Sequence, residues 1–143
     1  MNNTCKILLF LLLAFSCANV LAGIRANAQV AKETPLMTKD LPDVHGKEGL
    51  IETVVLSPGE VVPSHRHNAD VFAYVLEGSI VTQLEGQKSQ TVHSGEVFYE
   101  SPGDVHIATR NASVTQPAKL LVFFVKKIGA PTTVAVTTAN AAR

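Results

Sequence analysis

The sequence from Leu50 to Lys127 is a series of short apolar segments separated by turns, and this pattern restricts the fold more than any other feature. β-Branched and aromatic residues dominate the segments, and Gly, Pro, Asn and Ser dominate the connections; the segments are LIETVVL, DVFAYVL, IVTQL, QTV, VFYE, VHIAT and AKLLVFFVKK. No segment of useful length carries the 3.6-residue period of a helix. Short strands with turn signals between them are typical of β-sandwiches and β-barrels. We therefore predict an all-β domain.

The first 28 residues have the order and chemistry of a secretory signal peptide. Lys6 precedes the apolar run ILLFLLLAFSCANVLA, and the small residues ANA then lead to Gln29. A retained membrane anchor is the alternative, but the run is short for a span of about 20 residues. We expect cleavage before Gln29 and a periplasmic or secreted mature protein with no membrane segment.

The mature chain would have 115 residues, which is enough for one compact core. Both cysteines, Cys5 and Cys17, lie in the predicted signal peptide, so no disulfide would support that core. Removing Lys6 and Arg25 leaves ten Lys and Arg against twelve Asp and Glu. The chain has no basic run, so we expect no nucleic-acid partner.

Changes in composition divide the chain into four parts. After the signal peptide at residues 1–28, residues 29–48 are polar and interrupted by Pro and Gly, and we expect an extended lead-in with one short strand at most. Residues 49–128 hold the β-rich segments and form the predicted barrel. Residues 129–143 are rich in Thr and Ala, and they either add an edge strand or remain a loose tail.

His65 and His67 are the residues that first suggest chemistry. Side chains alternate along a strand, so the two imidazoles point to the same side if the chain is extended there. Two imidazoles one pleat apart can reach a single divalent ion. An isolated histidine pair is a weak signal, and its surroundings have to support it.

The glycines around this pair have the spacing of a known motif. Gly59 lies six residues before His65, and Gly78 lies eleven residues after His67. The segment resembles the first motif of the cupin superfamily, in which a glycine, His-x-His, a glutamate and a second glycine follow one another.

The second cupin motif is matched further along the chain. Gly95, Gly103 and His106 occupy its glycine and histidine positions. Ser101 stands where a proline is expected, and Asn111 comes one residue late. The resemblance covers roughly residues 50–127. The motif segments in this range are similar to those of small single-domain bacterial cupins.

This resemblance implies a jelly-roll β-barrel that binds one metal ion. The two histidines of the first motif and the histidine of the second are ligands in that family, which assigns the roles to His65, His67 and His106. Imidazole suits several divalent transition metals, so iron, zinc, nickel, copper and manganese all stay open.

One position departs from the family pattern. Counting back from Gly78, the glutamate of the first motif falls at Val71. Asp70 is the neighbouring carboxylate, and strand alternation points it away from the histidines unless an irregular turn intervenes. The sequence therefore predicts a site with three histidines and leaves Asp70 as the alternative fourth ligand.

Three further residues are candidates for catalytic roles. Glu100 lies six residues before His106, where it could support a ligand, transfer a proton or simply end a strand in solvent. Tyr74 and Tyr99 could line the pocket, although tyrosines in strands more often pack than react.

Three hypotheses follow for function. The first is an exported metal-dependent oxygenase or lyase acting on a small molecule. The second is a module that binds a small molecule or a metal without turnover, and the third is a structural barrel with a vestigial site. Both faces of the strand around Phe72 are apolar, which together with the cupin resemblance implies a homodimer.

Overall fold

A computed structural model describes residues 31–136, and every regular element in that range is a β-strand. Their bounds are β1 Lys32–Asp40, β2 Lys47–Leu56, β3 Val61–Val62, β4 His65–Arg66, β5 Ala69–Glu77, β6 Ser79–Leu84, β7 Gln90–His93, β8 Val97–Glu100, β9 Val105–Asn111, β10 Ala118–Lys127 and β11 Val134–Ala135. Within this range no helix is long and apolar enough to cross a membrane. The predicted signal peptide lies outside the described residues.

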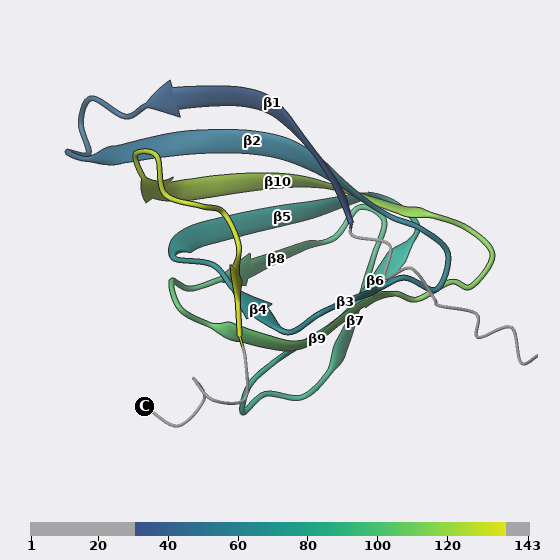
Figure 1. Cartoon of the computed structure of the whole chain (residues 1–143). Coiled ribbons are helices and arrows are strands. Elements are labelled where there is room, and N and C mark those ends of the chain that lie inside the picture. The colour runs from purple at the N-terminus through teal and green to yellow at the C-terminus, as the bar shows by residue number, and fades with distance from the viewer. Residues whose placement is uncertain (1–30, 137–143) are drawn as a thin grey trace, which may run out of the picture.

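The strands form two antiparallel sheets that face each other (Figure 1). One sheet has the order β1-β2-β10-β5-β8. The other has the order β11-β4-β9-β6-β7, and β3 also pairs with β9. Strands distant in sequence, such as β2 and β10, are therefore neighbours, as expected for a jelly roll. The prediction of an all-β jelly-roll fold is confirmed.

All seven predicted segments are strands, and four further strands join them. The lead-in contributes β1, a nine-residue edge strand paired with β2, which is longer than the short strand expected there. Its pairing is irregular between Pro35 and Met37, because proline cannot donate a hydrogen bond to a ladder. The tail contributes β11, which pairs with β4 beside His65.

The core lies between the two sheets and follows the alternation of the strands. In β5, residues Ala69, Val71, Ala73 and Val75 are at most 3% exposed. Inward residues of β2 and β10 and two residues of the second sheet complete the cluster; they are Leu50, Leu56, Ala118, Leu120, Val122, Phe124, Ile80 and Val92. Small residues on β5 leave space inside the barrel, and the candidate site uses that space.

Gly78 shows why the turn between β5 and β6 needs glycine. Its φ is +73°, a conformation that side chains disfavour. A Cβ at this position would also lie 2.8 Å from the carbonyl oxygen of Pro117. The turn can therefore pass against the start of β10 only with a bare backbone.

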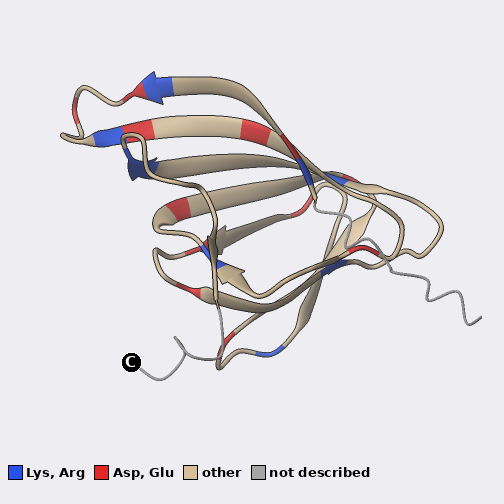
Figure 2. Ribbon diagram, viewed as in Figure 1, with Lys and Arg blue, Asp and Glu red and all other residues tan. Residues whose placement is uncertain are grey.

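Acidic and basic residues are interspersed along the described strands and turns (Figure 2). Basic segments lie at the adjoining ends of β1, β2 and β10, and acidic segments lie next to them there. This distribution agrees with the balanced composition of the sequence.

Candidate metal centre

Three histidines meet inside the barrel, two from the neighbouring strands β4 and β9 and the third, His67, from the connection between β4 and β5. His65 on β4 lies directly across from His106 on β9, and their rings stack with centroids 4.8 Å apart. The His67 ring lies 5.0 Å from that of His65 and 5.7 Å from that of His106. One ring nitrogen of each histidine lies within 4.8 Å of those of the other two. The two remaining histidines, His45 and His93, are exposed.

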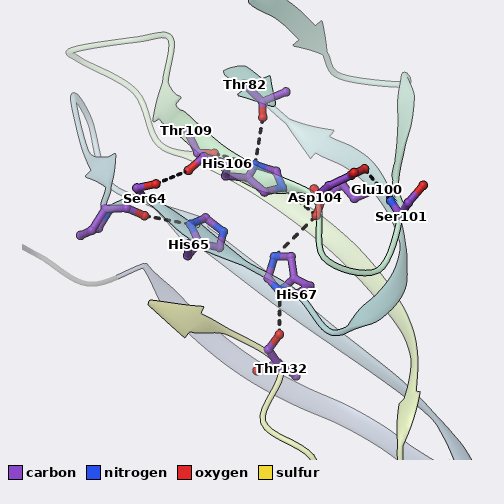
Figure 3. Close-up of polar contacts among 11 residues, drawn as sticks. Ser64, His65, His67, Thr82, Glu100, Ser101, Asp104, His106, Thr109 and Thr132 are labelled. Carbon is purple, nitrogen blue, oxygen red and sulfur yellow. Dashed lines mark hydrogen bonds and ion pairs between the residues drawn. The ribbon is translucent and has the colours of Figure 1, made fainter. Parts of the chain in front are cut away.

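Each imidazole is held by a hydrogen bond through its Nδ1 atom (Figure 3). The Nδ1 atom of His65 donates to the carbonyl oxygen of Pro63 at 2.8 Å, and that of His67 donates to Thr132 at 2.7 Å. A carbonyl oxygen only accepts, so both Nδ1 atoms carry a proton, and in the neutral form of each ring this tautomer places the lone pair on Nε2. The Nδ1 atom of His106 contacts the hydroxyls of Thr82 and Thr109, at 3.3 Å and 3.1 Å.

Burial keeps the site ready to bind a cation. It lowers the pKa of His65 from 6.5 to about 4; the nearby His106 and His67 act in the same direction, against the carbonyl of Pro63 and the carboxylate of Glu100. His65 is therefore neutral at neutral pH. A neutral imidazole is the form that binds metal.

Glu100, at the end of β8, joins the three histidines. Its Oε2 atom lies 2.8 Å from Nε2 of His106 and 3.6 Å from Nε2 of His67, and the residue is 5% exposed. The alternative that Glu100 simply ends a strand in solvent is therefore wrong. The carboxylate faces the cluster across the barrel from β4 and β9.

Asp70 does not reach the histidines, so the alternative of Asp70 as a ligand is wrong. Val71 lines the cavity with 1% exposure, and Asp70 points to the opposite face of β5, as the alternation of the strand requires. Its Oδ1 atom accepts a 2.7 Å hydrogen bond from the hydroxyl of Tyr99.

The two tyrosines also lie on the outer face of the five-stranded sheet. Tyr74 is 41% exposed and Tyr99 is 48% exposed, and both line a groove on the outside of the barrel. The expectation that they line the metal pocket is not met, because each sits at an outward position of its strand. The hydrogen bond with Asp70 raises the pKa of Tyr99.

A cavity of about 90 Å³ lies beside the histidine cluster. Its wall is mainly apolar and includes Val71, Phe98 and Phe124, together with the acidic residues Glu52 and Glu33. Burial raises the pKa of Glu52 from 4.5 to about 7, the carboxylate of Glu33 adds to this effect, and Lys126 opposes it.

Glu52 was not identified from the sequence as a candidate site residue, although its position in the sequence carried a signal. It takes an inward position in LIETVVL between Leu50 and Val54, where an acidic residue is costly unless it has a role. Thr82, Thr109 and Thr132, which hold the imidazoles, carry no such signal, because their contacts depend on the packing of separate strands.

The residues present suit a divalent transition metal. Three imidazoles converge, and each Nδ1 atom has a partner that orients the ring. The Nε2 atom of His106 and the Oε2 atom of Glu100 are buried and have no hydrogen-bond partner within residues 31–136. Buried polar atoms are normally satisfied, so these two mark a place for a missing partner.

Comparison with known proteins agrees with this geometry. The Cupin domain family matches residues 52–124. No curated protein matches the chain. Among solved structures, the chain is similar to the DMSP lyase DddQ from Ruegeria pomeroyi, with 20% identity, a TM-score of 0.61, and coverage of 75% of this chain and 52% of that one. The chain thus spans about half the length of that lyase.

Two further structures match over more of their own length. One is an uncharacterised protein with a double-stranded β-helix domain from Klebsiella pneumoniae, with 17% identity, a TM-score of 0.58, and coverage of 79% and 90% of the two chains. The other is a cupin-like protein from Thermotoga maritima, with 17% identity, a TM-score of 0.59, and coverage of 78% and 79%. At these identities the likeness establishes the fold alone.

Proposed function

The chain belongs to the cupin family, and we propose that it binds one divalent transition metal through His65, His67 and His106 and acts on a small molecule in the adjoining cavity. The observation that carries this proposal is the convergence of three imidazoles whose Nδ1 atoms are already engaged. Such hydrogen bonds fix the ring and its tautomer, which is how proteins prepare histidine ligands.

Of the chemistries open to this site, lyase-type proton transfer has the best support. A bound divalent ion would act as a Lewis acid on an oxygen of the substrate. Glu52 lines the same cavity, and a carboxyl with a pKa of about 7 can both accept and donate a proton near neutral pH. Oxygenase chemistry finds no comparable support among the residues of the described chain.

The apolar wall sets limits on the ligand. Val71, Phe98 and Phe124 would contact the non-reacting part of a small molecule and exclude water from the site. A module that binds its ligand without turnover is the second candidate, because Val71 stands where the family has a glutamate.

Metal analysis tests this proposal. The full chain is expressed, purified without a histidine tag, and compared with a His65→Ala/His106→Ala variant by elemental analysis. We expect close to one ion per chain in the wild type and none in the variant. Absence of metal from both proteins, even after incubation with iron, zinc, nickel, copper and manganese, would refute the proposal.

We also propose that two copies of the chain pair through the outer face of the five-stranded sheet. Phe72, Val97 and Tyr99 are 50%, 72% and 48% exposed there, and β8 is an edge strand of that sheet. A contiguous apolar face at a sheet edge is a suitable surface for a second copy. Sedimentation equilibrium tests this: we expect a dimer for the wild type and a monomer for Phe72→Asp.

The third part of the proposal is export. The support is the charged, apolar and small-residue order of residues 1–28 and the absence of cysteine from the rest of the sequence. Cell fractionation followed by N-terminal sequencing should recover a chain that begins at Gln29 outside the cytoplasm.

A further inference from the structure

Glu100 lies directly across from Val71 in the pairing of β5 with β8. Residues opposite each other in an antiparallel pair project to the same face, so both side chains enter the barrel. Val71 stands at the position where the cupin motif has a glutamate. The carboxylate that β5 does not provide is therefore present one strand away, at the same level of the barrel.

The distances from Glu100 to two of the three histidines have the size expected for ligands of one ion. Two donor atoms that each bind a metal at about 2.1 Å lie roughly 3.0–3.4 Å apart in tetrahedral or octahedral arrangements. The Oε2 atom of Glu100 lies 2.8 Å from Nε2 of His106 and 3.6 Å from Nε2 of His67, which brackets this range.

The contact with His106 is close but is not a hydrogen bond. Both the Oε2 atom of Glu100 and the Nε2 atom of His106 remain without a hydrogen-bond partner despite their 2.8 Å separation. Their relative orientation therefore fails the angular requirement of a hydrogen bond. Figure 3 shows the Glu100 side chain beside the rings of His106 and His67.

The burial of the Glu100 carboxylate also favours a cation beside it. The residue is 5% exposed, and its ion-pair partners among residues 31–136 are both histidines. Lys126, a buried lysine, is engaged by Glu48 and by the carbonyl oxygen of Ala130. A buried carboxylate is costly unless it is paired, and a divalent ion between Glu100 and the histidines would supply such a partner.

We propose that Glu100 is the fourth protein ligand of the metal, in place of the carboxylate that Val71 does not supply. This inference rests on the proposed metal site. The ligand set is then three imidazoles and one carboxylate, with the carboxylate contributed by β8 instead of β5. Adding a carboxylate oxygen favours harder ions such as manganese or iron over a site made of imidazole alone.

A double-mutant cycle with Co²⁺ as the probe tests this assignment. Apo-protein prepared from the full chain is titrated by calorimetry in four forms: wild type, Glu100→Gln, Val71→Glu, and the double variant. We expect Glu100→Gln to weaken Co²⁺ binding about 100-fold or more, beyond the 10–100-fold typical of groups that only orient a ligand. Val71→Glu should recover at least tenfold in the Glu100→Gln background.

The comparison between backgrounds decides the outcome. If Glu100 binds the ion, Val71→Glu has much less effect in the wild type, because the carboxylate position is already filled. An equal gain in both backgrounds would overturn the assignment, and so would a failure of Val71→Glu to rescue Glu100→Gln. Should a Val71→Glu variant not fold, the visible spectrum of bound Co²⁺ decides, since an identical spectrum in wild type and Glu100→Gln also overturns it.

Two controls separate this inference from the proposed metal site. His106→Ala should abolish Co²⁺ binding, and Asp70→Asn, which removes a carboxylate from the outer face of β5, should leave it unchanged. A wild type that binds no Co²⁺, or binds no better than His106→Ala, refutes the metal site itself. Binding that is lost in His106→Ala and undiminished in Glu100→Gln refutes only the role of Glu100.

Discussion

The two faces of β5 differ sharply although they belong to one strand. The inner face carries Ala69, Val71, Ala73 and Val75, which are small and at most 3% exposed. The outer face carries Phe72 and Tyr74, which are large and 50% and 41% exposed. The larger side chains of this strand lie on its outer face and the smaller ones on its inner face. A simple hydrophobic core would have the opposite arrangement. The barrel interior thus leaves room, and the outer face of β5 exposes aromatic side chains.

The same contrast continues on β10, the neighbouring strand. Phe124 is 2% exposed, lines the cavity and packs against the ring of His67 with centroids 5.3 Å apart. Phe123 points the other way and packs with Phe72 on the outer face. Adjacent residues of one type therefore serve different surfaces, and variants at such pairs can test the contrast directly.

The largest effect is expected from a charge placed on the inner face. Val75→Asp should lower the free energy of unfolding by about 4 kcal/mol or more, because Val75 is 0% exposed and a carboxylate there has no partner. Tyr74→Asp, one residue away, should cost about 1 kcal/mol or less. Urea unfolding at low protein concentration measures both, and similar costs would contradict the assigned faces.

The next effect should come from the paired phenylalanines of β10. Phe124→Ala should destabilise the chain by about 3–5 kcal/mol, since it removes a buried ring from the core. Phe123→Ala should cost less than half as much in a dilute sample. Because the outer face is the proposed dimer surface, the cost of Phe123→Ala should increase with protein concentration while that of Phe124→Ala should not.

Much of this contrast could be predicted from the sequence. The turn signals located the seven main strands, and alternation placed Val71 with the histidines and Phe72 away from them. The same rule, applied to Tyr74, puts it on the outer face with Phe72, against the expectation that it could line the pocket. The resemblance to the two cupin motifs identified His65, His67 and His106, because these short motifs carry the three residues.

Other features depend on long-range pairing that a sequence does not display. The face taken by Glu100 is set by its register with Val71, and a turn separates it from His106, so alternation could not be counted across. Pro35 obscured β1, since proline is tolerated in a strand only at special positions such as an edge. The contact of Thr132 with His67 joins residues 65 positions apart and leaves no local trace.

A smaller effect is expected from the buried acid on the inner face. The pKa of Glu52 is about 7 in the folded chain and 4.5 is its ordinary value, so the folded state binds this proton more tightly than the unfolded state. Stability from this group is fully present below about pH 4.5 and is lost as the pH rises to about 7. The difference corresponds to about 3 kcal/mol. Glu52→Gln should therefore gain stability over the wild type across this range.

Urea unfolding of both apo-proteins from pH 4.5 to pH 7.5 measures this linkage. Subtracting the two curves isolates Glu52, because the other titrating groups are common to both proteins. A difference that stays constant with pH would show that Glu52 titrates normally and would remove the basis for proton transfer by this residue. Glu33→Gln should give a partial effect of the same sign, because the carboxylate of Glu33 adds to the raised pKa.

The smallest effect is expected on the outer face, at the pair formed by Asp70 and Tyr99. The hydroxyl of Tyr99 donates to Asp70, and this bond raises the pKa of Tyr99 by stabilising its protonated form. Asp70→Asn removes the charge, so the pKa of Tyr99 should fall toward its ordinary value of 10. Absorbance at the phenolate band during alkaline titration measures the change, with Tyr99→Phe identifying the signal. Metal affinity should stay unchanged, because this carboxylate and that of Glu100 lie on opposite faces of the sheet; a loss of affinity in Asp70→Asn would show that the two faces are coupled.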